Sequence, residues 1–192
     1  MSRNIYWGSV KVPQIKYNSY YLRRASGLAV RTGWRFTGID ASPAPGPDAG
    51  IAAAIEALSG RPFGAAGTLA ACAAITEALK SLDAPTCGYS GLMLPVLEDK
   101  LLARRAAEGR FGVQDLLLYS SVCGTGLDVV PLPGDTPAET LAALVGDVAA
   151  LALKYHKPLS ARLFPVPGKA AGDAVDFPDN PFLTASRIME AG

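Results

Sequence analysis

The sequence has few of the residues from which metal and redox centres are usually built. Its 192 residues include one histidine, His156, and three cysteines, Cys72, Cys87 and Cys123, which lie far apart and form no C-x-x-C pair. This spacing argues against a zinc knuckle and against the disulfide framework of a small secreted domain. A Ser-His-Asp triad also has little support, because His156 falls at the end of a predicted helix, where a cation suits the helix dipole.

Long apolar runs are missing as well. No stretch approaches the ~18 apolar residues of a membrane helix, and the most apolar helical segment, residues 137–153, contains Glu139 and Asp147. The first 21 residues are polar and aromatic and have no apolar signal-peptide core. We therefore expect no membrane segment and, with no export signal, a cytoplasmic location.

Acidic residues do not occur in the first 39 positions, which hold seven Lys and Arg residues. We interpret residues 1–32 as a basic N-terminal arm or helix, solvated or at an interface, and residues 33–192 as a single α/β domain. Tyr17, Tyr20 and Tyr21 interleave with the basic residues, but no DNA- or RNA-binding motif accompanies them. Nucleic acid is therefore not an expected partner.

Glycine and proline divide the chain into alternating helices and strands. Helices are expected over residues 17–30, 51–58 and 67–82, with Thr68 as the N-cap of the third, and from Pro95 to about residue 108. Strands are expected over residues 34–40, 116–122, 127–132 and 159–166, the middle two forming a hairpin around CGTG.

The clearest local signal is a helix start at Thr136, Pro137 and Glu139, followed by an apolar stripe that continues to about residue 157. Because strands precede and follow this helix, the three elements form a right-handed parallel crossover. The predicted fold class is α/β, with parallel strands and crossover helices.

Five sequence blocks carry a family resemblance: GIDASPAPGPD (38–48), GAAGTLAACAAI (64–75), SGLMLPVLED (90–99), VCGTGLDVVPLPGDTPAETLAAL (122–144) and ARLFPVPGKAAGD (161–173). With these blocks the chain, from about residue 33 to its C-terminus, resembles an uncharacterised prokaryotic family. This family is called domain of unknown function seven-one-one, and its members are often named PFL family proteins.

The resemblance implies the fold of the pyruvate formate-lyase-like glycyl radical superfamily, an α/β barrel with an inner hairpin, and no established activity. It places Cys123 at the tip of a finger loop within the barrel. A glycyl radical loop is not supported, because residues 186–192 contain Arg187 and Ile188 but no Gly-aromatic pair. Family members are longer, so the chain resembles their C-terminal part, and we expect a homo-oligomer or a partner that supplies the N-terminal half.

Cys123 and Asp128 are the candidate catalytic residues. A reactive cysteine needs a nearby cation or helix N-terminus that favours the thiolate. The alternative is a small buried residue beside Gly124 and Gly126, since free cysteines are usually buried.

Five residues are candidates for ligand binding. Gly64, Gly67 and Thr68 precede or open a helix, where backbone N–H groups can meet an anion, although a tight turn with a capped helix explains them equally. Arg162 lies within an apolar strand, so it pairs with a carboxylate or binds an anionic ligand, and Lys169 lies in a nearby turn.

Asp40, Glu98 and Asp99 lie at the ends of predicted elements, where their oxygens would suit a hard divalent cation such as magnesium. The alternative is that they are helix caps or solvated side chains. Two function hypotheses follow. The chain is either a domain that binds or acts on a small anionic metabolite without glycyl radical chemistry, or a structural or subunit half that completes a larger assembly.

Overall fold

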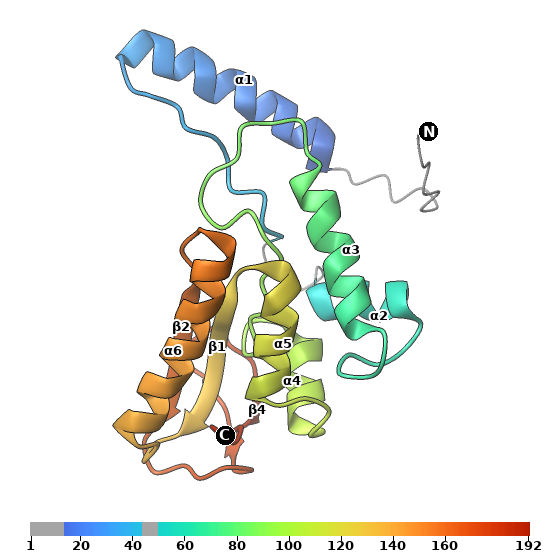
Figure 1. The fold of residues 1–192 in the computed structure, drawn as a ribbon, viewed down its shortest axis with the longest axis vertical. Coiled ribbons are helices and arrows are strands. Elements are labelled where there is room, and N and C mark those ends of the chain that lie inside the picture. Colours follow the sequence, from blue (N-terminus) through green and yellow to red (C-terminus); the bar gives the residue numbers. More distant parts are fainter. Residues whose placement is uncertain (1–13, 44–49) are drawn as a thin grey trace. The chain divides into compact units, whose positions relative to one another are not determined.

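The computed structural model describes residues 14–43 and 50–192, and its contacts divide the chain into two compact units (Figure 1). The first unit comprises residues 1–40 and 82–88, and the second comprises residues 41–81 and 89–192. Residues 1–13 of the expected basic arm, and residues 44–49 of the Pro- and Gly-rich loop, lie outside the described residues. The expected division at residues 32 and 33 stays a prediction.

The first unit contains one helix, α1 (Gln14–Thr32), which ends at Gly33 as predicted, with a φ of 73°. The strand predicted over residues 34–40 is wrong, because only Ile39 forms a bridge, to Thr86. Ile39 donates its N–H to the Pro85 carbonyl oxygen over 3.0 Å and accepts from Cys87 N–H over 2.9 Å. An alternating pattern becomes a strand only when a neighbouring segment pairs along its length, and here the pairing covers one residue.

The second unit begins with helices α2 (Ile51–Ser59) and α3 (Thr68–Lys80). Gly60 ends α2 in the left-handed conformation, as predicted. The N-cap of α3 is Gly67 rather than Thr68, which is the first helical residue. Aromatic rings beneath these helices contact one another edge to face, with centroids 4.9 Å apart for Phe63 and Phe111.

Helix α4 (Lys100–Ala107) begins five residues later than predicted. The Asp99 carboxylate accepts from the N–H groups of Leu101 and Leu102, so it acts as the N-cap, while Pro95 instead forms a parallel bridge to Asp128. Residues before Asp99 therefore pair with a strand rather than starting the helix.

The predicted hairpin around CGTG is wrong, because residues 116–122 belong to helix α5 (Val113–Cys123). Gly112 donates its N–H to the Asp115 carboxylate over 2.8 Å, which is one half of a capping box. Gly124 ends the helix with a φ of 65°. The CGTG segment is thus a helix-to-strand connection.

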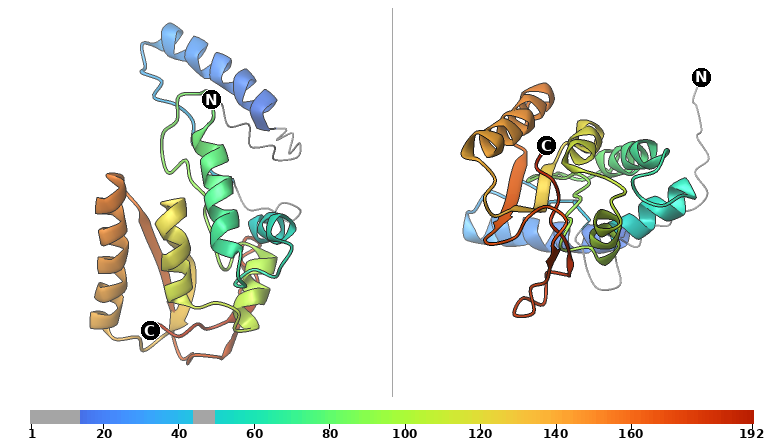
Figure 2. Two further views of the ribbon diagram at one scale, coloured as in Figure 1. Left: turned by 45° about the vertical axis from the view of Figure 1, so that its right-hand side comes forward. Right: turned by 90° about the horizontal axis from the view of Figure 1, so that it is seen from below.

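The predicted strand–helix–strand crossover is confirmed. Strand β1 (Gly126–Pro133), helix α6 (Ala138–Tyr155) and strand β2 (Ser160–Val166) follow in order, and the two strands pair in parallel. Figure 2 shows α5 and α6 on the same side of the β1–β2 pair. A Cβ atom at Gly126 would lie 2.0 Å from the Ser160 carbonyl oxygen, so only glycine fits the first pair of the ladder.

The chain after β2 returns to the core through the short antiparallel pair β3 (Ala174–Val175) and β4 (Ser186–Arg187). Met189 donates its N–H to the Pro131 carbonyl oxygen, and the Ser186 hydroxyl donates to the Ala103 carbonyl oxygen. The described residues are a mixed α/β structure whose core centres on β1, which is buried at every position except Pro133. Among them, no helix has both the length and the apolar character that crossing a membrane requires.

Candidate functional site

Three charged residues from separate segments of the second unit meet at one end of the β1–β2 pair. Arg162 on β2 donates from Nε to Asp128 Oδ1 on β1, and from Nη1 and Nη2 to the two Glu98 oxygens over 3.0 and 3.3 Å. Glu98 lies in the turn before α4. We call Asp128, Arg162 and Glu98 the charged cluster. Of the two alternatives for Arg162, a carboxylate partner or an anionic ligand, the structure shows carboxylate partners, and each of its three nitrogens donates one hydrogen bond to them.

A β-bulge orients Asp128 within this cluster. The β1–β2 register shifts between Leu127 and Val130, so β1 has one more residue than β2 over this stretch. Val129, in the bulge, is fully buried and has a φ of 47°. A β-branched residue in the left-handed region is a genuine outlier that costs about 1–3 kcal/mol, so the surrounding structure must impose it.

The second carboxylate oxygen of Asp128 has no partner. Asp128 is 3% exposed, and its Oδ2 is buried without a hydrogen-bond partner among the described residues. Burial raises the pKa of this carboxyl, and the bond from Arg162 opposes the rise without cancelling it. A buried oxygen without a donor is costly, and Asp128 Oδ2 is the buried side-chain atom among the described residues that lacks a hydrogen-bond partner.

Cys123 lies elsewhere, at the C-terminal end of α5, and is 1% exposed. Its sulfur lies 3.1 Å from the Thr125 hydroxyl, which donates its single hydrogen to the Leu92 carbonyl oxygen. The thiol is therefore the donor to Thr125 and keeps its proton. Burial raises the pKa of Cys123, and the negative end of a helix dipole also disfavours a thiolate. The geometry matches the alternative of a small buried residue.

The glycine turn before α3 satisfies its own backbone. Gly64 N–H donates to the Thr68 hydroxyl over 3.1 Å, the hydroxyl donates to the Ala65 carbonyl oxygen, and Thr68 N–H donates to the same carbonyl. Thr68 is buried. The N–H groups of Gly64 and Thr68, two of those that could meet an anion, are used within the turn.

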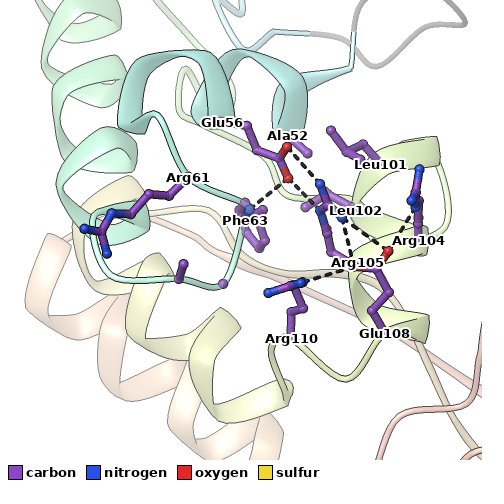
Figure 3. A network of polar contacts seen from close by, with 12 residues as sticks. Ala52, Glu56, Arg61, Phe63, Leu101, Leu102, Arg104, Arg105, Glu108 and Arg110 are labelled. Carbon is purple, nitrogen blue, oxygen red and sulfur yellow. Dashed lines mark hydrogen bonds and ion pairs between the residues drawn. The ribbon is translucent and has the colours of Figure 1, made fainter.

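A network of ion pairs holds α2 to α4 (Figure 3). The Glu56 carboxylate accepts from Arg105 Nε over 2.7 Å, from Arg105 Nη2 over 3.0 Å and from Phe63 N–H over 2.8 Å. Arg105 Nη1 also donates to Glu108 over 2.9 Å. This pairing has no signal in the sequence, because residues 56 and 105 are adjacent only after α2 and α4 have packed.

Two of the three residues predicted to hold magnesium have protein partners for their carboxylates. Both oxygens of Asp99 accept backbone N–H groups, from Ala52 and from the first turn of α4, and Glu98 binds Arg162. Asp40 belongs to the first unit. The described residues contain no group of three His, Cys, Asp or Glu side chains that could hold a metal ion. The exposed Lys169 follows β2 in a turn, where its carbonyl oxygen accepts from Gly134 N–H.

Comparison with known proteins assigns the family. Residues 14–182 match the family described as Uncharacterised ACR (DUF711). The chain belongs to this family. The expected membership is therefore correct, and it carries no established activity.

Curated relatives in the family are considerably longer than the chain. A UPF0210 protein of Desulforudis audaxviator is 41% identical over an alignment of 188 residues, which covers 92% of this chain and 41% of the relative. A relative from Pyrobaculum arsenaticum is 41% identical over 78% of this chain and 35% of its own length. A relative from Corynebacterium glutamicum is 37% identical over 85% of this chain and 38% of its own length. The chain thus spans about two fifths of the length of these proteins.

Proposed function

We propose that this chain is one part of a larger assembly, in which further polypeptide covers the β1–β2 pair. The observation that carries the proposal is the contrast between the two strands. Every residue of β1 except Pro133 is buried, whereas no residue of β2 is. Parallel strands in folded proteins are normally covered on both faces, so a half-exposed parallel strand favours a covering partner.

The outward side of α6 supports the same proposal. Leu153 is 76% exposed and Val145 is 49% exposed, and the helix positions around them are mostly alanine. Exposed apolar residues that gather on one helix favour an interaction surface over a solvated face. In this proposal α6 and β2 contribute to one interface.

The covering polypeptide is family sequence of the kind that this chain does not include. The relatives carry about three fifths of their length beyond the matched region, which is ample to cover a strand and a helix. The assembled protein then has the pyruvate formate-lyase-like barrel that the resemblance implies. A second copy of this chain is the alternative occupant, and the test below separates the two.

The test measures assembly directly. The chain is purified alone, and also together with a separate polypeptide carrying the unmatched part of the Desulforudis audaxviator relative. Light scattering after size exclusion gives the mass, and hydrogen exchange reports the β2 amides. We expect a one-to-one complex in which the β2 amides gain protection. A homodimer with the same protection would assign the interface to a second copy.

Two substitutions of equally exposed apolar residues give the control. Leu153→Arg on α6 is expected to weaken the complex at least about tenfold, while Phe182→Arg, in the C-terminal loop and 79% exposed, leaves it unchanged. A chain that remains monomeric at high concentration, binds no family sequence and shows rapid exchange in β2 would contradict the proposal.

A further inference from the structure

We propose that the charged cluster binds a primary ammonium group, with Asp128 Oδ2 as the principal acceptor. This inference uses a different observation from the proposed function and does not require the assembly. Asp128 Oδ2 is buried and has no donor among the described residues. A carboxylate oxygen held in this state by a strained bulge is prepared to accept a hydrogen bond that the described chain does not supply.

The net charge of the charged cluster favours a positively charged ligand. Two carboxylates and one guanidinium give a formal charge of −1, and all three donor nitrogens of Arg162 are occupied by carboxylate oxygens. An anion would meet two carboxylates, and the single guanidinium of the cluster already balances one of them. A cation completes the charge balance, and this argues against the anionic metabolite that the sequence analysis considered.

The number of acceptors selects an ammonium over a metal ion. Arg162 makes three hydrogen bonds to the four carboxylate oxygens of the cluster; Oδ2 receives none, and each Glu98 oxygen accepts one bond and has a further lone pair. An ammonium brings three N–H donors for these positions. Among the described residues, no group of three His, Cys, Asp or Glu side chains could hold a metal ion.

The ligand would enter from the side of β2. Asp128 is 3% exposed, whereas Arg162 is 45% exposed, so the cluster is closed behind Asp128 and open at Arg162. Because Oδ2 is buried in the structure, the proposal requires the long Arg162 side chain to move aside when the ligand binds. The ammonium has two possible sources, a small free amine and a lysine side chain of the covering polypeptide, and the experiment separates them.

The experiment titrates the intact chain with propylammonium chloride, and follows the Asp128 carboxyl carbon and the backbone amides by NMR. The matched probes are tetramethylammonium, a cation without N–H donors, and propionate, an anion. We expect propylammonium to shift the Asp128 carboxyl signal and the amides of residues 96–98, 127–130 and 161–163 saturably, and the other two probes to leave them in place.

Variants locate the effect. Asp128→Asn is expected to weaken propylammonium binding at least tenfold, and Asp179→Asn, an exposed acid in the C-terminal loop, to leave it unchanged. The wild-type carboxyl signal keeps the test decisive if Asp128→Asn does not fold. If free amines do not bind but Asp128→Asn weakens the complex with family sequence tenfold, while Asp179→Asn does not, the donor is a lysine of the covering polypeptide.

Three results would overturn the inference: equal shifts with tetramethylammonium, binding of propionate instead, or no response to amines together with an unchanged complex in Asp128→Asn. Saturable amine binding by a chain that never assembles would contradict only the proposed function. The two proposals can therefore fail separately.

Discussion

The reactivity of the three thiols tests whether Cys123 is a reagent or a core residue. Cys123 and Cys72 are buried, while Cys87 in the first unit is half-buried. Burial raises the pKa of Cys72 to about 12 from 9.0 and raises that of Cys123 as well. We expect only Cys87 to react in the folded protein.

The magnitude follows from the thiolate fraction, since the thiolate is the nucleophile. At about pH 8, a thiol of pKa about 12 is ionised in roughly one molecule in 10,000, against about one in ten for a pKa of 9.0. The chemical step at Cys72 is therefore slowed about a thousandfold before access is considered. Burial also raises the pKa of Cys123, and the negative end of the α5 dipole further disfavours its thiolate.

The assay is alkylation with iodoacetamide, followed by mass spectrometry of the three cysteine peptides, in the folded protein and in concentrated guanidinium chloride. Labelling of Cys72 and Cys123 should require opening of the core, so their rates rise with added urea, whereas the rate of Cys87 changes little. Cys87→Ser should remove the rapid phase. Native labelling of Cys123 within tenfold of Cys87 would refute the assignment of a buried, protonated thiol.

Three further predictions use urea unfolding. Gly126→Ala forces a Cβ to 2.0 Å from the Ser160 carbonyl oxygen at a φ of 96°, so it should lower the free energy of unfolding by about 3 kcal/mol or more. Gly146→Ala, in α6 with open space around it, should instead raise the free energy of unfolding by about 1 kcal/mol. Similar effects at both positions would refute the steric argument. Glu56→Gln should lower the free energy of unfolding by about 2 kcal/mol near neutral pH, because it breaks a charge-assisted pair with Arg105. That pair lowers the pKa of Glu56, so its stabilisation is present above pH 4.5 and is lost as the pH falls through the folded-state pKa. A stability difference from wild type that does not depend on pH would contradict the pairing. Burial raises the pKa of Asp128 above 3.8. The stability of the wild type relative to Asp128→Asn should therefore be greatest below pH 3.8 and decline as the pH rises through the folded-state pKa. A rise in this relative stability with pH would instead show that the ion pair with Arg162 outweighs burial.

The crossover was predictable because its signals are local. Thr136, Pro137 and Glu139 announce a helix start, and the structure begins α6 one residue after Pro137. An apolar run on each side of one helix is then enough to predict two parallel strands joined by a crossover. Elements that depend on pairing with a distant segment are harder to predict from the sequence. Residues 34–40 are an example, because one bridge forms there in place of the predicted strand.

The hairpin failed because a short apolar run does not distinguish a strand from a buried helix by periodicity alone. Residues 116–122 read as a strand, yet the sequence carried a helix signal at Gly112 and Asp115 and a left-handed end at Gly124. With Cys123 predicted at a strand turn, a reactive thiol and a small buried residue were both open. Once residues 113–123 form a helix, the same residue is buried at its C-terminal end.

The charged cluster was predictable in part. A charge within the apolar strand around Arg162 required a partner, and Asp128 and Glu98 were each noted as acids at element ends. Their meeting depends on the parallel register of β1 and β2 and on one additional residue in β1. A bulge leaves no reliable local signature, so the unpartnered oxygen could be found only in three dimensions.

Two avoidable costs coincide at that bulge, and their coincidence is the strongest argument that it has a role. Three non-glycine residues in the described chain have positive φ, and among Ser90, Val129 and His156 only Val129 is β-branched. Glycine there would relieve the backbone strain, and an uncharged residue at position 128 would remove the buried oxygen without a donor. Strain and an unsatisfied charge at adjacent positions are expected where a structure holds a group ready for a partner. If Val129→Gly stabilises the chain while weakening its response to propylammonium, the strain serves binding; if the response is unchanged, the bulge serves only the fold.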